Sequence, residues 1–315
     1  MLSFFEYFRL YWLLLVLGLS GCYGLGGQDN AKVEASAPVA AAAGAAAGIF
    51  VSSNPDYRLP SRVSLCGEAF DLNRQSVYER LEFEFIRVVN HPAQVALWQR
   101  RAAVYFPTIE AELKAAGLPD DLKYLAVAES DLRPWIVSPA GALGLWQFMP
   151  STARHFGLNV DKKRDVRHLP EPLTGAAVSY FKSLYRKFGS WSLAMAAYNA
   201  GDGRVGKAVE AQGSNNYFEL DLPRETERYV YRIAAIKVVM ENASAYGFNQ
   251  PVPGDHYRPV KYADRTVQLP AKTTGEWTQL AKQLGCEYKD LRMMNPHILE
   301  YPLSGTLEVR VPVAR

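Results

Sequence analysis

The chain has 315 residues, and a hydrophobic content of 49% with 12% aromatic residues is ample for buried cores in about one to three domains. Its net charge is only +3, and no dense block of Lys and Arg alternates with aromatic residues. We therefore expect no nucleic acid among its partners, whereas the slight positive excess suits an anionic polymer.

The N-terminus reads as an export signal. The apolar run at residues 10–19, LYWLLLVLGL, is much shorter than the ~20 residues that a membrane-spanning helix needs. The small residues before Cys22 resemble a lipobox, so we expect residues 1–22 to be a lipoprotein signal peptide and the Cys22 sulfur to carry a lipid. An uncleaved apolar anchor is the alternative. Residue 24 is Gly rather than the Asp linked to inner-membrane retention in enteric lipoproteins. The expected place is therefore the cell envelope, lipid-anchored in the outer membrane and facing the periplasm.

Residues 23–54 have the composition of a linker. Their centre at residues 35–48, ASAPVAAAAGAAAG, lacks both the large apolar side chains of a core and the charges of a solvated helix. We expect an Ala/Gly-rich tether of variable reach between the membrane surface and the folded part.

Residues 55–95 predict a helical preface to the main domain. Residues 73–90 within them have the pattern of an amphipathic helix, which His91-Pro92 ends. One packing face has the helical spacing of Val77, Leu81, Phe85 and Val88. We expect this helix to pack on the domain that follows and to have a structural role.

A single carboxyl group stands near the end of the next helical stretch. Helices are predicted over residues 92–116 and 119–133, and Glu129 lies in the last turn of the second. Leu122, Leu125 and Glu129 fall at i, i+3 and i+7, so the acid shares the apolar face. Partial desolvation raises the pKa of a carboxyl group and favours a general acid near neutral pH. The alternative is a helix-terminal Glu that faces solvent.

Three motifs follow Glu129-Ser130 in the chain. Residues 138–153 read SPAGALGLWQFMPSTA, residues 197–201 read AYNAG and residues 225–230 read ETERYV. In order and spacing they resemble the soluble-lytic-transglycosylase domain, and they are most similar to the membrane-bound D-type branch of the lytic transglycosylases. The resemblance covers roughly residues 95–245. It implies a mainly α catalytic domain of the lysozyme-like α+β superfamily, which we place at residues 96–250.

The resemblance also implies a reaction on peptidoglycan glycan strands. Glu129, as the single general acid/base, would protonate the oxygen between N-acetylmuramic acid and N-acetylglucosamine while the N-acetyl group stabilises C1. It would then take the proton from the C6 hydroxyl of the same sugar, which attacks C1 and leaves a 1,6-anhydromuramic end. Water is not consumed, and the family needs no metal or cofactor.

Substrate-binding residues are carried over from the motifs by position. They are Ser138, Gly144, Gln147, Tyr198, Asn199 and Tyr229. A turn serine, a surface glutamine and core tyrosines are the structural alternatives. Trp146 stands where many relatives have methionine, so both sugar stacking and core packing remain open for it.

Ordinary glycosidases use two carboxyl groups, and this chain offers two weak candidates for the second. Asp131, two residues after Glu129, would face away on a helix, whereas Asp202 follows the second motif. A goose-type lysozyme-like hydrolase, which needs such a carboxylate, is therefore one alternative. A non-catalytic peptidoglycan-binding scaffold is another.

Residues 201–206 match G-x-G-x-x-G, but a helix-like segment precedes them, so we expect a loop that passes close to a sugar rather than a dinucleotide site.

The remaining elements of the main domain are assigned from local pattern. Residues 161–172 are charged and bounded by proline, which predicts a surface loop. Helices are predicted over residues 174–188, 192–199 and 225–242.

Residues 266–313 predict a small separate module. A helix near residues 277–284, a second near 291–296 and a final strand at 307–312 resemble a LysM fold, a βααβ glycan binder. The usual Gly-Asp-Thr opening is replaced at residues 272–275, so sugar binding and packing support both remain open. Cys66 and Cys286 could form a disulfide in an exported chain or stay as separate thiols.

Overall fold

The computed structural model describes residues 56–248, 257, 260–269 and 276–313. All of them belong to one compact unit, Val51–Arg315. The predicted signal peptide with Cys22 and the predicted linker at residues 23–54 lie outside the described residues. Within the described part, no helix combines the length and the apolar character that crossing a membrane requires.

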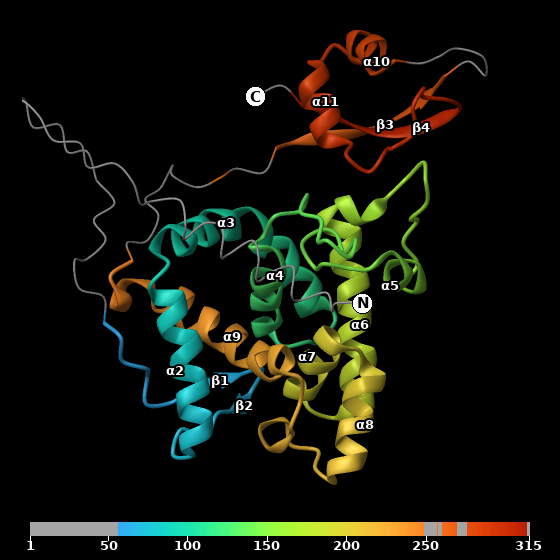
Figure 1. The fold of residues 1–315 in the computed structure, drawn as a ribbon. Coiled ribbons are helices and arrows are strands. Elements are labelled where there is room, and N and C mark those ends of the chain that lie inside the picture. Colours follow the sequence, from blue (N-terminus) through green and yellow to red (C-terminus); the bar gives the residue numbers. More distant parts are fainter. Residues whose placement is uncertain (1–55, 249–256, 258–259, 270–275, 314–315) are drawn as a thin grey trace, which may run out of the picture. The chain divides into compact units, whose positions relative to one another are not determined.

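Helices make up most of the described chain, which confirms the mainly α fold class (Figure 1). The long elements in chain order are α2 Gln75–Val89, α3 Pro92–Ala115, α4 Lys123–Ser130, α5 Pro150–His155, α6 Pro170–Phe188, α7 Trp191–Ala200, α8 Asp202–Gln212 and α9 Arg224–Glu241. Short 3-10 turns are Asp120–Leu122, Val166–His168, Tyr217–Glu219 and Ala243–Tyr246. The two-residue strands β1 Ser64–Leu65 and β2 Glu68–Ala69 pair antiparallel before them.

Helix α2 packs against α9 through the face that its sequence predicts. Its four periodic residues Val77, Leu81, Phe85 and Val88 are all buried. They join a core cluster that extends from Val63 to Phe248, so the preface and the predicted catalytic domain share one core. This common core holds α9, which carries the third motif, in a fixed position.

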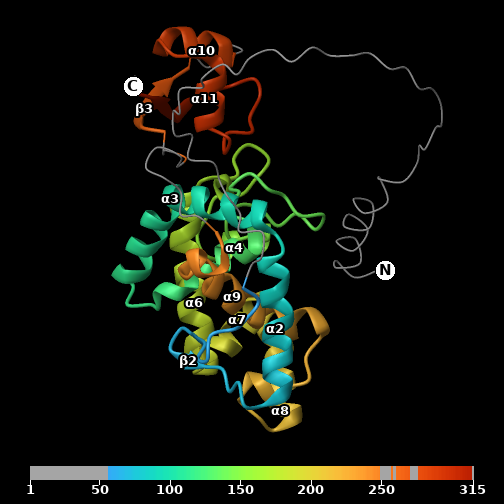
Figure 2. The same cartoon turned by 90° about the vertical axis from the view of Figure 1, so that its left-hand side faces the viewer.

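Helix α7 lies at the centre of this core. Its residues from Trp191 to Ala197 are buried, as expected for a helix that is apolar all round. It contacts α6, α8 and α9, and the view in Figure 2 also places it among these helices. The second motif therefore starts from a rigid buried helix and emerges at its C-terminal end.

The hairpin of β1 and β2 holds the start of α7. The carboxylate of Glu68 accepts hydrogen bonds from the backbone N–H groups of Trp191 at 2.5 Å and Ser192 at 3.0 Å, and from the Ser192 hydroxyl at 2.6 Å. A negative charge at a helix N-terminus is stabilised by the helix dipole and by the unpaired N–H groups there. Residues far outside the family motifs thus help to fix the helix that carries one of them.

Three sequence predictions are wrong in detail. The second helix ends at Ser130, three residues early, because Asp131 and Leu132 both adopt positive φ angles of 55° and 56°. Residues 161–172 are not a surface loop throughout: Asp165 and Arg167 are buried, and α6 already begins at Pro170. Residues 201–206 are not a loop, because α8 begins at Asp202, directly after Gly201.

The C-terminal module follows the predicted βααβ order. Its elements are β3 Tyr262–Gln268, α10 Trp277–Leu284, α11 Tyr288–Met294 and β4 Thr306–Pro312, and β3 pairs antiparallel with β4. A separate small core includes Trp277, Leu280 and Leu291. Its assignment to the LysM fold stays a prediction, and residues 272–275 lie outside the described residues. Cys66, which is buried, and Cys286 are both free thiols in this structure.

Candidate active site

Glu129 stands in the last turn of α4, next to a sharply bent piece of backbone. Tyr124, Leu125 and Val127 of this short helix are buried, which fixes its orientation. The Ser130 hydroxyl lies 3.0 Å from the Ala126 carbonyl and 2.8 Å from the Leu145 carbonyl. The end of α4 is therefore tied to the loop that carries the first motif.

Two consecutive non-glycine residues with positive φ follow Glu129-Ser130. Such conformations are strained and persist only where surrounding contacts hold them. Here the Asp131 carboxylate accepts hydrogen bonds from Trp98 Nε1 at 2.9 Å and from Arg133 at 3.0 Å, and its carbonyl accepts one from Arg101. Asp131 thus holds the turn, and its carboxylate is committed to Trp98 and Arg133.

The carboxyl group of Glu129 meets the third motif directly. The Tyr229 hydroxyl, from α9, donates a hydrogen bond to Glu129 Oε1. Burial raises the pKa of Glu129 to about 7, while the Tyr229 hydrogen bond and the charge of Arg232 act in the opposite direction and Glu225 raises it further. Near neutral pH this carboxyl can therefore hold a proton and release it, which is the requirement for a group that acts first as an acid and then as a base.

Charged residues of α9 form ion pairs near this carboxyl, and the motif resemblance does not identify them as part of the site. Arg232 pairs with Glu225 at 3.1 Å and lies 3.7 Å from Glu84 of α2. Glu84 is only 2% exposed and also accepts a 2.5 Å contact from Arg228. The sequence contains one signal for the role of Glu84: this charged residue lies between Leu81 and Val88, within the apolar stripe of α2.

Tyr198, from the second motif, also binds the loop of the first motif. Its hydroxyl donates to the Trp146 carbonyl at 2.6 Å, and its ring stacks on Phe181 with centroids 5.1 Å apart. Burial, with a smaller effect from the charge of Glu129, raises the pKa of Tyr198 well above its ordinary value. The group is therefore a neutral hydroxyl donor at any physiological pH.

Trp146 is fully buried, and its Nε1 donates to the Thr174 hydroxyl at 3.0 Å. Its side chain fills the core, which resolves the open alternative of sugar stacking. Asn199 Oδ1 accepts a hydrogen bond from the Thr226 hydroxyl at 3.0 Å. The second and third motifs are thus joined to each other where α7 ends and α9 begins.

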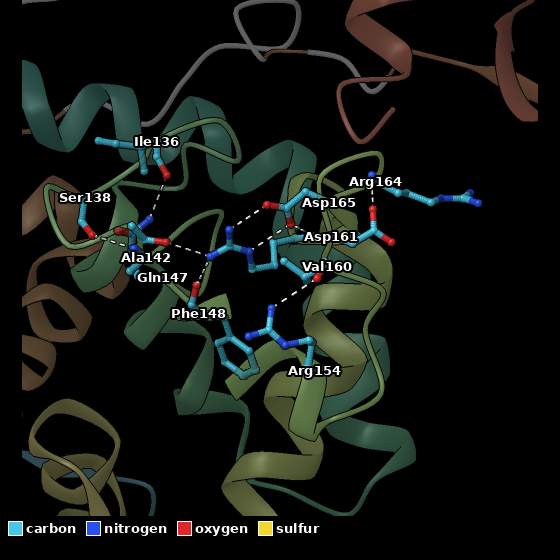
Figure 3. A network of polar contacts seen from close by, with 12 residues as sticks. Ile136, Ser138, Ala142, Gln147, Phe148, Arg154, Val160, Asp161, Arg164 and Asp165 are labelled. Atoms are coloured by element: carbon cyan, nitrogen blue, oxygen red, sulfur yellow. Dashed lines mark hydrogen bonds and ion pairs between the residues drawn. The ribbon is translucent and has the colours of Figure 1, made fainter. Parts of the chain in front are cut away.

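Ser138, Gly144 and Gln147 shape the loop of the first motif. Ser138 Oγ accepts a hydrogen bond from Ala142 N at 2.9 Å, and Gln147 Nε2 donates to the carbonyls of Ile136 at 3.1 Å and Gly144 at 2.9 Å (Figure 3). Gln147 itself has a positive φ of 47°. Among the described residues, Gln147 Oε1 has no hydrogen-bond partner, and Ser138 is not hydrogen-bonded to Glu129. These side chains fix the loop backbone.

Gly144 is required by close packing. Its φ is 85°, and a Cβ there would lie 2.5 Å from the Arg167 carbonyl oxygen and 2.6 Å from Leu173 Cδ2. No other residue fits without moving the backbone.

The other candidate acid, Asp202, lies apart from this site. It is half exposed at the start of α8 and pairs with Lys187, which holds the pKa of the Asp202 carboxyl below its usual range. Helix α7 directly precedes residues 201–206, so this glycine pattern lacks the strand that a dinucleotide site needs. In the described part of the chain, Glu225 is the carboxylate whose charge acts on Glu129, and it is already paired with Arg232.

Comparisons with known proteins match part of this chain, including the segment that carries Glu129 and the first two motifs. A family model described as "Transglycosylase SLT domain" matches residues 106–220. The chain is 37% identical over 219 residues to membrane-bound lytic murein transglycosylase D of Escherichia coli K12, which covers 67% of this chain and 47% of that protein. It is 42% identical over 86 residues to the soluble lytic murein transglycosylase of Salmonella typhimurium, covering 26% and 13%. Peptidoglycan transglycosylase gp16 of phage T7 is 40% identical over 101 residues, covering 31% and 8%. The chain thus spans about half the length of the first of these relatives.

Proposed function

We propose that the chain, whose residues 106–220 match the model of the transglycosylase SLT domain, is a peptidoglycan lytic transglycosylase. It cleaves the β-1,4 bond between N-acetylmuramic acid and N-acetylglucosamine without water and leaves 1,6-anhydromuramic ends. One observation carries this proposal: Glu129 combines a pKa near 7 with a hydrogen bond from the buried Tyr229.

Each step uses Glu129 in a different protonation state. The protonated carboxyl gives its proton to the glycosidic oxygen, and the resulting carboxylate accepts the proton of the C6 hydroxyl as that oxygen attacks C1. A group with a pKa close to the working pH can serve both steps without a large cost in either. Tyr229 donates to the carboxyl in the second state and so lowers the energy of the carboxylate while it waits for the C6 proton.

Glycan contacts are assigned to the loop and to the helix ends that surround Glu129. We propose that Ser138, Gly144, Gln147, Tyr198 and Asn199 shape the glycan site. Gln147 Oε1 can accept a hydrogen bond from a sugar hydroxyl or amide, because its Nε2 is already bound to the loop. Tyr198 and Asn199 act through the backbone and through Thr226.

Hydrolysis is the second candidate, and Glu225 is the residue that would support it. Its charge acts on Glu129, whereas Asp131 and Asp202 are bound to other partners. The ion pair with Arg232 keeps Glu225 from serving readily as a base for water, which favours the anhydro product. A non-catalytic wall-binding scaffold is the remaining alternative, and it gives no reason for a carboxyl with a pKa near 7.

The proposed place is the cell envelope. The Escherichia coli relative is named as membrane-bound, and the lipobox-like residues before Cys22 support a lipid anchor in the outer membrane with the SLT domain in the periplasm. Peptidoglycan strands lie within reach of a domain on the tether of residues 23–54.

The test compares activity with binding on purified sacculi. The chain without residues 1–22 should release soluble muropeptides, and Glu129→Gln should bind sacculi equally well but release them about 10²–10⁴-fold more slowly. Equal release by both proteins would exclude Glu129 as the acid, and binding without release by the unchanged sequence would favour the scaffold.

A further inference from the structure

A buried ion pair lies directly behind the loop of the first motif. Arg167 and Asp165 are each only 7% exposed. The guanidinium meets the carboxylate with two parallel hydrogen bonds, from Nε to Oδ1 at 2.9 Å and from Nη2 to Oδ2 at 2.7 Å. Asp165 Oδ1 also accepts the Arg167 backbone N–H at 3.1 Å, which fixes the start of the 3-10 turn Val166–His168.

The remaining side of the Arg167 guanidinium binds two backbone carbonyls of the first-motif loop. Arg167 Nη1 donates to the carbonyls of Gly141 and Phe148, both at 2.8 Å. Figure 3 shows Phe148 and Asp165 in this network together with Ser138 and Gln147. The two carbonyls stand at the ends of residues 141–148, which we call the motif loop. The loop carries Gln147, and its Leu143 and Phe148 exchange two backbone hydrogen bonds at 3.1 Å.

The backbone of Arg167 completes the contact. Its carbonyl oxygen packs against Gly144 so closely that a Cβ would come within 2.5 Å. The same loop is bound to the end of α4 through Leu145 and Ser130. The motif loop therefore contacts both Arg167 and the end of α4, the helix that carries Glu129.

Arginine is the only side chain that can make this set of contacts. Its planar fork supplies four hydrogen bonds at fixed angles to one carboxylate and two carbonyls, whereas a lysine ammonium is a point charge with three donors on a flexible stem. A buried charge is tolerated only when it is paired and hydrogen-bonded. Asp165 meets that need, so the pair can remain buried behind the loop.

We propose that Arg167, held by Asp165, is a positioning residue that fixes the motif loop in the shape that binds the glycan strand. The proposal rests on the proposed function and names a further determinant of the same site. Arg167 touches neither the sugar nor Glu129, and it acts by holding the carbonyls of Gly141 and Phe148. Loss of the fork should weaken glycan binding while Glu129 keeps its protonation behaviour.

The test uses the full chain in detergent and peptide-free glycan strands prepared from sacculi. Arg167→Lys keeps the charge but loses the fork, and Asp165→Asn keeps the shape but loses the partner charge. The matched control is Lys237→Met, which breaks the partly buried pair with Asp121. Lys237 follows Tyr229 by eight residues, about 12 Å along α9.

We expect both loop variants to raise KM about tenfold or more, since small displacements of positioning groups cost one to two orders of magnitude. The midpoint of the pH profile of kcat should not move. The control should lower thermal stability and leave KM unchanged. If Arg167 and Asp165 had only a structural role, the loop variants would contain fewer active molecules. Their apparent kcat would then be lower while KM stayed the same.

A second measurement separates this proposal from the proposed function. Binding to the same glycan strands is measured in the Glu129→Gln background, with and without each loop variant. Weaker binding of the loop variants than of the Lys237→Met control supports the proposal even if no cleavage is seen. If the folded loop variants and the control bind the glycan strands with equal affinity, the positioning role of Arg167 is overturned. If Arg167→Lys fails to fold, the affinity of Asp165→Asn provides the test. If the unchanged chain releases no anhydro fragments, the proposed function fails, not this binding role.

Discussion

The hydroxyl of Tyr229 donates a hydrogen bond to the carboxyl of Glu129, so two residues that lie 100 positions apart in sequence form one unit. Tyr229 is 2% exposed within α9, and α9 packs against both α2 and α4. The tyrosine is therefore fixed by the core before any ligand binds. This unit supports a direct role for Glu129 in proton transfer, and its properties can be measured separately.

Replacement of the proposed acid should abolish turnover selectively. Glu129→Gln keeps the shape of the side chain but can neither give nor take a proton, so muropeptide release should fall by about 10²–10⁴-fold. Glu112→Gln, at an exposed position of α3, is the matched control and should retain full activity. A similar loss in both variants would point to a cause other than proton transfer.

Removal of the Tyr229 hydroxyl should shift the pH profile. The hydrogen bond favours the ionised carboxyl, so Tyr229→Phe should raise the pKa of Glu129 further above its value of about 7. Cleavage needs the protonated carboxyl, and the alkaline limb of kcat/KM should therefore move to higher pH. Tyr246→Phe removes a hydroxyl from a core tyrosine that packs on Phe85 and should leave the profile in place.

The charge of Arg232 should lower the pKa of Glu129, as the hydroxyl of Tyr229 does. Arg232→Met removes a positive charge that favours the carboxylate, and the alkaline limb should again move to higher pH. Arg232→Lys keeps the charge and should keep the profile close to that of the unchanged protein. A shift of equal size in both variants would mean that geometry, and not charge, sets the pKa of Glu129.

Glu129 should also make stability depend on pH. Its pKa is near 7 in the folded state against an ordinary value of 4.5, so the folded state retains a proton that the unfolded state releases between these pH values. This group therefore lowers the free energy of unfolding as pH rises from 4.5 to 7, by about 3 kcal/mol in full. Urea unfolding should show Glu129→Gln more stable than the unchanged chain at pH 8 and equal to it at pH 4. A constant difference at both pH values would contradict the raised pKa.

Gly144 and Gly203 should respond in opposite ways to alanine. At Gly144 a methyl group would collide with the Arg167 carbonyl, and the φ of 85° is itself unfavourable, so Gly144→Ala should destabilise the protein by about 2–4 kcal/mol. At Gly203, inside α8, nothing lies within 4 Å of an added Cβ. Gly203→Ala should stabilise by about 0.5–1 kcal/mol. Thermal unfolding of the two variants measures both effects.

Periodic sequence patterns identified most of the helices but not the ends that depend on tertiary contacts. The packing face of α2 was visible from spacing, and its residues are buried as expected. The end of α4 was not, because Asp131 keeps a positive φ only through Trp98, Arg101 and Arg133.

Buried charges were the second limit of sequence reasoning. Asp165 and Arg167 read as parts of a solvated loop, since nothing local indicates that their charges neutralise each other behind the motif loop. The motif resemblance assigned Tyr229 to the substrate-binding residues, and in the structure its hydroxyl donates a hydrogen bond to Glu129. It gave no hint of Arg232, whose partner Glu84 comes from a helix outside the motifs.

The most direct test of the central claim is the mass of the sugar ends released from purified sacculi. If Glu129 takes the proton from the C6 hydroxyl of the same sugar, the fragments carry anhydro ends that are one water lighter than reducing ends. Reducing ends as the main product would contradict the account and would make Glu225→Gln the next variant to measure.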